Sequence, residues 1–291
     1  MMSQGQNYAE QQASSFQGLR VPTGVTGLDH LISGGLRRGM TYLVAGETGT
    51  GKTIFSLRFL LKGASEGEAG LYVPFDETIQ GTVEGALTLG WDLDEPIRKN
   101  MLRILDVRPF FAEVVREKFM AEIVQKVIKE LRKHVEQLHA KRLVIDPVAP
   151  LMGEVVDISW TREYIRGFVA AAENYLGCTT IITSEVPTGS QTLSRFGVEE
   201  FLSSGIIKLS IANVNNRSYR SIQIRKMRWT NIDLEQYVFD IKPSEGIVVM
   251  GPLHKVASET SDSVGRSPSF PSSIPPPPSA NPVGEDAGVF G

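Results

Sequence analysis

The chain has 291 residues, of which 41% are hydrophobic and 22% charged, and its net charge is −3. These values are typical of a globular protein with one α/β core. The acidic pI, about 5.9, argues against bulk-charge binding to nucleic acid, although a local basic patch stays open as an alternative. No apolar run has the length of a membrane span, so we expect no membrane partner. A single cysteine and a polar start without an export-signal profile predict a cytoplasmic location.

The two ends of the chain differ in composition from the middle. Residues 1–18 are rich in Gln, Ser and Asn and lack periodicity, which predicts a disordered N-terminal arm. Residues 257–291 are dominated by Ser, Pro and Gly, which predicts a disordered tail with too little apolar surface to fold. The tail is also a candidate ligand for a proline-recognition domain, although it lacks the flanking basic residue that such ligands carry. Residues 19–256 are then the single folded domain.

Strand and helix patterns alternate through the folded domain. Strands are predicted over 41–45, 71–75, 142–146 and 179–183, and helices over 54–62, 81–89, 119–138 and 164–176. Three later strands, 206–211, 220–228 and 236–241, follow without helices between them. This order predicts an α/β fold with a largely parallel central sheet flanked by helices and an antiparallel C-terminal extension. Cys178, between a helix and a strand, fits a small core residue better than a nucleophile.

The first strand leads into the segment from Gly46 to Thr53, which fits the phosphate-loop pattern G-x-x-x-x-G-K-[ST] between a strand and a helix. Glycines allow the backbone N–H groups to face inward as an anion nest, and the helix adds its positive N-terminal end. Lys52 supplies a cation for the β and γ phosphates, and Thr53 offers a hydroxyl to Mg²⁺. The predicted triphosphate contacts are Gly46, Thr48, Gly49, Thr50, Gly51, Lys52 and Thr53. An ordinary glycine-rich turn is the less favoured alternative.

Acidic residues follow two of the predicted strands at their carboxyl ends. Asp146 ends an apolar strand, where ligands of open α/β sheets gather, and is placed to hold Mg²⁺ beside the hydroxyl of Thr53. An ordinary turn-capping aspartate is the alternative. Asp76 and Glu77 follow another strand, where a carboxylate can orient a water molecule and take its proton during phosphoryl transfer. The polar first turn of a helix explains these two acids equally well.

The late strand 220–228 carries cations in an alternating pattern. The alternation predicts that Lys226 and Arg228 share a face with Ile222 and Ile224 and project together from the end of the sheet. Two cations so placed imply an anionic partner, either nucleic acid or the triphosphate of a neighbouring subunit reached as an arginine finger reaches it. A salt-bridged strand end is the alternative.

Five segments in the right order resemble a single KaiC-type domain of the RecA superfamily. They are residues 20–29, 33–39, 72–78, 194–201 and 226–228, and the resemblance covers residues 19–252. It implies a RecA-like P-loop NTPase fold with ATP bound between the subunits of a hexameric ring. It also implies that Glu77 and Asp76 activate water beside Lys52, with Asp76 standing where the family has glutamate. The residues that would reach the ATP of the next subunit are Lys226, Met227, Arg228 and Thr230.

The sequence therefore predicts a Mg²⁺-dependent ATPase that forms a homo-oligomer, a hexameric ring, and acts through slow hydrolysis as a switch or timer for an unidentified signalling partner. Gly197 and Val198 stand where the second domain of KaiC carries its phosphorylated Ser-Thr pair, so self-phosphorylation there is not expected. Two alternatives stay open. One is a recombinase-like ATPase stimulated by DNA, which the acidic pI does not favour. The other is a nucleotide-sensing scaffold with negligible hydrolysis, whose proline-rich tail recruits a partner.

Overall fold

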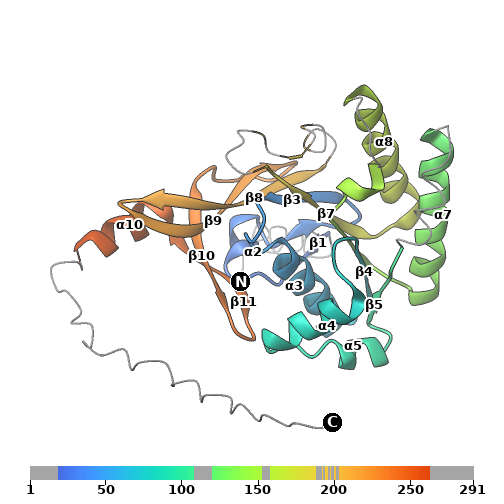
Figure 1. The fold of residues 1–291 in the computed structure, drawn as a ribbon, viewed down its shortest axis with the longest axis horizontal. Coiled ribbons are helices and arrows are strands. Elements are labelled where there is room, and N and C mark those ends of the chain that lie inside the picture. The colour runs from blue at the N-terminus through green and yellow to red at the C-terminus, as the bar shows by residue number, and fades with distance from the viewer. Residues whose placement is uncertain are drawn as a thin grey trace, which may run out of the picture.

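The computed structural model describes residues 19–107, 120–152, 158–187, 192, 194–195, 197, 200 and 203–262. Through this part of the chain runs a nine-stranded sheet in the order β11-β10-β9-β8-β3-β7-β6-β4-β5 (Figure 1). The predicted N-terminal arm and the tail beyond residue 262 lie outside the described residues, as does half of the segment 194–201. None of the helices in the described ranges combines the length and apolar character that a bilayer crossing requires.

Six of the nine strands of the sheet pair in parallel with one another, as the alternation of strands and helices predicted. They are β8 (Gly205–Val214), β3 (Thr41–Gly46), β7 (Thr179–Glu185), β6 (Arg142–Asp146), β4 (Gly70–Pro74) and β5 (Leu102–Ile104). The strands β9 (Arg217–Met227), β10 (Gln236–Lys242) and β11 (Gly246–Pro252) extend the sheet in antiparallel pairing. The predicted fold class is confirmed.

Helices cover both faces of the sheet, which explains why its central strands are buried along their whole length. On one face lie α3 (Lys52–Ser65), α4 (Ile79–Thr88) and α5 (Asp94–Arg98), and on the other α7 (Met120–Leu138) and α8 (Ile158–Ala171) (Figure 1). In β3, Leu43 and Ala45 join the core under α7 and α8, whereas Tyr42 and Val44 join the core under α3. Such two-sided burial is the usual state of a parallel sheet.

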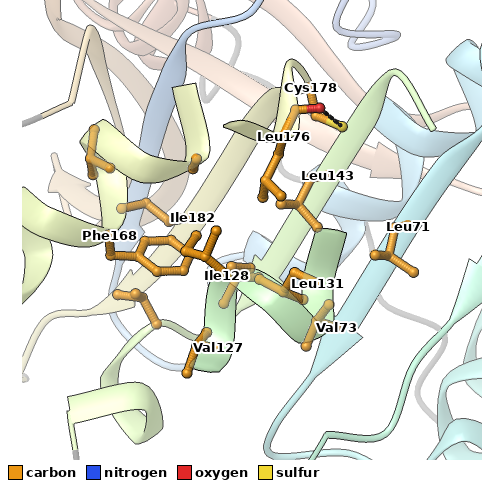
Figure 2. Close-up of a cluster of buried hydrophobic side chains, with 14 of the residues drawn as sticks. Leu71, Val73, Val127, Ile128, Leu131, Leu143, Phe168, Leu176, Cys178 and Ile182 are labelled. Carbon is orange, nitrogen blue, oxygen red and sulfur yellow. Dashed lines mark hydrogen bonds between the residues drawn. The ribbon is translucent and has the colours of Figure 1, made fainter. Parts of the chain in front are cut away.

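The core beneath α7 and α8 is built from side chains at helical spacing. Figure 2 shows Val127, Ile128 and Leu131 of α7 facing the strands, because residues three and four apart lie on one side of a helix. Cys178 is buried in the same core, and burial raises the pKa of its thiol to about 12. The prediction that Cys178 is a core residue is therefore confirmed.

Sequence patterns missed the short and irregular elements. These are β1 (Arg20–Val21), α2 (Leu28–Leu31), β2 (Leu36–Arg37), α5, β5, β11, the 3-10 turn η1 (Ala149–Met152) and α10 (Leu253–Asp262). Most of them are too short to display a hydrophobic period. The predicted helix 164–176 is present, but its last part is the π-helical turn η2 (Ala172–Leu176). The helix α10 reaches Asp262 and so crosses the predicted end of the domain at residue 256.

The predicted alternation of β9 is wrong at its end. Strict alternation placed Lys226 on the face of Ile222 and Ile224. The pairing of β8 with β9 shifts its register between Ile224 and Lys226, where Arg225 is the extra residue of a β-bulge. The bulge inverts the alternation, so Met227 rather than Lys226 follows Ile224 into the core under α3.

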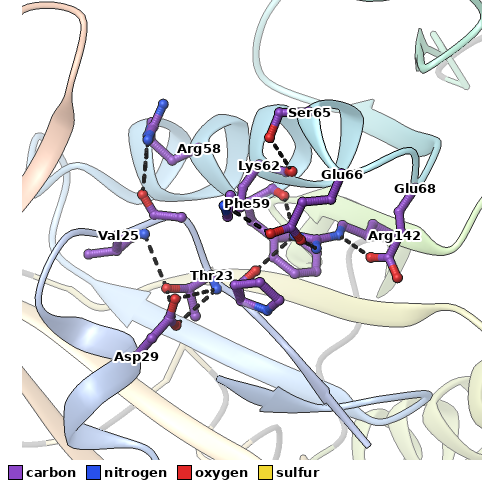
Figure 3. A network of polar contacts seen from close by, with 12 residues as sticks. Thr23, Val25, Asp29, Arg58, Phe59, Lys62, Ser65, Glu66, Glu68 and Arg142 are labelled. Atoms are coloured by element: carbon purple, nitrogen blue, oxygen red, sulfur yellow. Dashed lines mark hydrogen bonds and ion pairs between the residues drawn. The ribbon is translucent and has the colours of Figure 1, made fainter. Parts of the chain in front are cut away.

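A buried arginine ties the first residue of β6 to the end of α3 (Figure 3). Arg142 is 0% exposed, and its guanidinium donates to the carboxylate of Glu68 at 2.9 Å and to the carbonyl oxygens of Pro22 and Phe59 at 2.8 Å each. Glu66 lies 3.3 Å away, and the Phe59 ring lies under the guanidinium with its centroid at 4.7 Å. Four of the five N–H donors of this buried charge thus have oxygen partners, as burial of a charge requires.

Replacing Arg142 by Met should lower the free energy of unfolding by about 3 kcal/mol, because two carbonyl groups and a carboxylate lose their buried partner. Urea denaturation followed by circular dichroism measures the change. Arg132→Met is the matched control, since its ion pair with Glu136 is exposed and should contribute at most about 0.5 kcal/mol. Equal losses in the two variants would contradict the role of the buried network.

Candidate active site

The glycine-rich loop joins the end of β3 to the start of α3 at the carboxyl edge of the parallel strands. Gly51 has φ of 103°, a conformation that favours glycine, and it begins the helix by accepting a hydrogen bond from the N–H of Phe55 at 2.9 Å. At Gly46 a Cβ atom would collide with the backbone carbonyl of Leu209 on β8. The backbone shape of the loop therefore depends on glycine at both positions.

Lys52 extends back along the loop. Its ammonium donates to the carbonyl oxygens of Gly46 and Glu47 at 3.0 Å each, and the residue is 8% exposed. Burial lowers the pKa of Lys52, while the carboxylates of Glu185 and Asp146 oppose that shift. A partly desolvated cation at a helix N-terminus is suited to an anionic ligand.

Asp146 lies at the centre of a cluster of hydroxyl groups. Its Oδ2 accepts hydrogen bonds from Thr53 at 2.8 Å and from Tyr72 at 2.9 Å, and its Oδ1 accepts one from Thr183 at 2.5 Å. The predicted neighbourhood of Asp146 and the loop hydroxyl is thus present in the structure. A hydroxyl and a carboxylate together offer the hard oxygen atoms that Mg²⁺ prefers.

Most of the predicted residues meet in one pocket with a volume of about 410 Å³. The predicted residues that line it are Thr48, Gly49, Gly51, Lys52, Thr53, Asp76, Glu77 and Asp146. Thr50 does not line it, because its side chain is buried and its hydroxyl donates to the carbonyl of Glu47 at 2.8 Å, which braces the loop. Gly46 contributes through its carbonyl group, which holds Lys52.

The two adjacent acids follow β4 and precede α4. Thr78 caps that helix by accepting from the N–H of Gly81 at 3.0 Å, so Asp76 and Glu77 lie before the helix, outside its first turn. The carboxylate of Glu77 accepts weakly from Thr82 at 3.5 Å. Burial raises the pKa of Asp76, and the nearby carboxylates of Glu185 and Asp146 add to that rise.

The basic residues at the end of β9 lie away from this pocket within one chain. Across β8, the loop end of β3 is level with Ile222 of β9, whereas Met227 is level with the opposite end of β3. Lys226 donates to the carbonyl of Glu200 at 3.0 Å, and Thr230 accepts from Arg20 at 2.9 Å. Neither these residues nor Arg228 line the pocket.

An exposed tryptophan follows the basic residues. Trp229 is 84% exposed and has φ of 60°, a conformation that is uncommon for a bulky residue. The backbone around it is fixed, because the N–H of Arg228 donates to Ser204 at 2.8 Å and the N–H of Thr230 donates to Met227 at 3.3 Å.

The family described as "ATPase: KaiC" matches residues 21–254 of the chain. The chain belongs to the KaiC family of ATPases. This membership confirms the resemblance drawn from the separated motifs.

Individual relatives agree with this assignment. The circadian clock oscillator protein KaiC of Thermostichus vulcanus is 33% identical over 82% of the chain, which spans 46% of that protein. A UPF0273 protein of Pyrococcus horikoshii is 31% identical over 79% of the chain and 93% of its own length. The crystal structure of a KaiC-like protein from Pyrococcus horikoshii OT3 matches with a TM-score of 0.68 and 34% identity, covering 79% of this chain and 98% of that one. The chain thus spans about half of the KaiC protein but nearly all of its shorter archaeal relatives.

Several pocket residues of this KaiC-family domain were not predicted from the sequence. They are Ile54, Tyr72, Pro74, Pro147, Glu185, Arg220 and Ile241. Glu185 ends the strand next to β3 and accepts from Thr48 at 3.3 Å, so its place after the predicted strand 179–183 was a usable signal. Arg220 and Ile241 come from the antiparallel strands β9 and β10, whose position beside the loop no local pattern reveals.

Asp76→Asn should raise the thermal unfolding midpoint at pH 7. The pKa of Asp76 is raised because its ionised form is less favourable in the folded chain than in the unfolded chain. The ionised carboxylate therefore lowers stability when the pH is above the raised pKa. When the pH is below the ordinary value of 3.8, the carboxyl group is neutral in both states and the effect is absent. The advantage of the variant should therefore shrink as the pH falls through the raised pKa. Circular dichroism measurements of the unfolding midpoint between pH 3 and pH 8 test this, because that range begins below the ordinary pKa of 3.8.

Asp233→Asn provides a control of opposite sign. Hydrogen bonds from the N–H of Glu235 and the hydroxyl of Tyr237 lower the pKa of Asp233, so its contribution to stability is present at neutral pH and is lost in acid. This variant should lower the midpoint at pH 7. An Asp76→Asn variant that behaved in the same way would contradict the assigned cause.

Proposed function

We propose that the chain is a Mg²⁺-dependent ATPase that hydrolyses ATP slowly in a homo-oligomeric ring, a hexamer, and acts as a switch or timer for a signalling partner. The observation that carries the proposal is the pocket itself, where the loop cation Lys52, the Thr53–Asp146 pair and the Asp76–Glu77 carboxylates face one space. Location in the cytoplasm belongs to the same proposal.

The phosphate loop supplies the binding energy for the triphosphate. The backbone amides after Gly46 and the N-terminus of α3 attract the phosphate oxygens, and Lys52 exchanges its two carbonyl partners for the β and γ phosphates. Since burial lowers the pKa of Lys52, an anionic ligand also restores the stability of its charged form.

Thr53 and Asp146 fit the role of holding Mg²⁺. The proton of the Thr53 hydroxyl points to Asp146, which leaves the lone pairs of that oxygen for a cation. The described residues contain no group of three or more His, Cys, Asp or Glu that could hold a metal. Phosphate oxygens and water molecules would supply the other ligands, as is usual for Mg²⁺. When bound, Mg²⁺ neutralises charge on the β and γ phosphates.

Asp76 and Glu77 are the proposed water-activating pair. Both line the pocket at its edge, beyond the end of β4, and a carboxylate there can orient a water molecule toward the γ-phosphate and take its proton. The raised pKa of Asp76 makes its carboxylate a stronger base than that of an ordinary aspartate. Its side chain is one methylene shorter than the glutamate of the family. Slow turnover is expected because the shorter side chain of Asp76 places its carboxylate less favourably than the glutamate would.

Lys52→Ala should abolish ATP binding and hydrolysis, whereas Glu77→Gln should keep binding and slow hydrolysis by about 10²-fold to 10³-fold, because only the proton acceptor is lost. Phosphate release under single-turnover conditions and equilibrium binding of a fluorescent ATP analogue measure the two effects separately. Lys62→Ala is the control, since Lys62 lies on the same helix in an exposed ion pair with Glu66. Unchanged hydrolysis in both site variants would overturn the proposed mechanism.

A site shared between subunits explains the position of the basic residues. Lys226 and Arg228 lie at and just after the end of β9 that is remote from the loop of their own chain, so any contact with a nucleotide in that loop would be to the loop of a neighbour. The resemblance to the KaiC family supports the same arrangement. A cation supplied in this way would stabilise the charge of the transition state.

Subunit mixing tests the shared site directly. A double variant, Lys226→Ala with Arg228→Ala, and the variant Glu77→Gln should each lose most of their hydrolysis when assayed alone. Mixed oligomers should recover activity, because Glu77 of one subunit can then face the intact cations of the other, at about one site in four for random mixing. Hydrolysis measured before and after mixing checks this.

Three outcomes would change the proposal. No recovery on mixing, together with a monomer in light scattering at saturating ATP, would remove the ring and the action of Lys226 between subunits. Stimulation of hydrolysis by single-stranded DNA, with strong salt dependence, would favour the recombinase-like alternative. Full partner capture but no hydrolysis by the intact chain, lost when residues 263–291 are deleted, would favour the scaffold.

A further inference from the structure

Two of the three hydroxyl groups around Asp146 have no role in the proposed chemistry. Thr53 is the metal-side hydroxyl of the phosphate loop, but Tyr72 and Thr183 come from the neighbouring strands β4 and β7. Tyr72 is 1% exposed, yet it lines the proposed nucleotide pocket. A buried tyrosine needs a partner for its hydroxyl, and here that partner is the carboxylate assigned to the metal.

The sheet register directs both hydroxyls to the carboxylate. Tyr72 pairs with Val144, two residues before Asp146, so the side chains of Tyr72 and Asp146 lie on the same face of the sheet, under α3. The ring of Tyr72 spans the remaining distance along the strand and brings its hydroxyl to Oδ2. On the other side, β7 pairs in parallel with β6 and places Thr183 at Oδ1.

The hydrogen bonds fix how much of the carboxylate stays available. An ionised aspartate offers about four acceptor positions, and three of them are occupied by Thr53, Tyr72 and Thr183. One position is left, on Oδ1. Asp146 therefore has a single lone pair to offer to Mg²⁺ or to a water molecule bound to it, which excludes bidentate coordination by this residue.

We propose that Tyr72 is a positioning residue for Mg²⁺ in this chain, with Thr183 as its counterpart on the other carboxylate oxygen. The inference rests on the proposed function, since it concerns the same metal. Together the two hydroxyls hold the Asp146 carboxylate in the plane that accepts the Thr53 proton, and so keep the Thr53 oxygen turned toward the ion. Loss of such a contact to a metal ligand commonly weakens metal affinity by about 10-fold to 100-fold.

Tyr72→Phe is the decisive variant, because it keeps the ring in the core and removes only the hydroxyl. The half-saturating Mg²⁺ concentration for binding of a fluorescent ATP analogue should rise by about tenfold, while binding without Mg²⁺ should stay within about twofold of the wild type. Tyr42→Phe is the matched control. It removes another buried hydroxyl of the same core, on β3, which two strands separate from β4 in the sheet. The partner of that hydroxyl is the N–H of Arg37 at 2.7 Å, so both values should stay unchanged.

A second pair of variants isolates the other oxygen. Thr183→Val removes the hydroxyl at nearly constant volume and should also raise the half-saturating Mg²⁺ concentration, whereas Thr183→Ser keeps a hydroxyl and should retain the wild-type value. Circular dichroism confirms that each variant is folded before titration. Spectroscopic titration with Mn²⁺ in place of Mg²⁺ gives an independent readout of metal affinity.

The Mg²⁺ titrations separate results that contradict the positioning role of Tyr72 from results that concern only the proposed hydrolysis. A Tyr72→Phe variant with the Mg²⁺ requirement of the wild type, or with equal losses in the presence and absence of Mg²⁺, would overturn the positioning role and leave a core tyrosine. If the wild type bound nucleotide without any effect of Mg²⁺, both the metal site and this inference would fall. Mg²⁺-dependent binding without hydrolysis would remove only the proposed activity and would leave the inference standing.

Discussion

The parallel pairing of β4, β6, β7 and β3 determines where the reactive groups of this protein lie. Each of these strands ends at the same edge of the sheet, and each delivers its next side chains to that edge: Asp76 after β4, Asp146 from β6, Glu185 from β7 and the phosphate loop after β3. Because backbone hydrogen bonds fix the register, a residue shift in any strand would move a carboxylate to the opposite face. Position along the strand is therefore as important for the site as residue identity.

The cores on the two faces of the sheet differ in polarity. The core under α7 and α8 is apolar and holds the parallel strands together, whereas the core under α3 ends in polar groups at the pocket. Tyr72 illustrates the transition, because its ring belongs to the apolar cluster and its hydroxyl to the carboxylate of Asp146. At the far end of the same strands, Arg142 closes the layer with buried hydrogen bonds to the end of α3. Helix α3 is thus held at both ends by β6.

Local patterns were sufficient for the fold class and for the centre of the site. The GETGTGKT segment specifies its own backbone shape through glycine, and Asp146 could be placed because apolar strands of parallel sheets end at a common edge. Register could not be predicted in the antiparallel part, since a bulge at Arg225 leaves no mark in the sequence and inverts the face of Lys226. Arg220, Ile241 and Thr183 were missed for a related reason. Their proximity to the pocket follows from pairing between strands, which is a long-range property of the chain.

The burial of Cys178 has a practical consequence for studying assembly. The chain contains one thiol, and it is 0% exposed, with a pKa raised to about 12, so almost none of it is the reactive thiolate at neutral pH. A cysteine introduced in place of exposed Trp229 would then be labelled selectively, without removal of the native residue. A dye at that position marks the end of the sheet opposite the phosphate loop, and energy transfer between labelled copies would report whether the chain assembles.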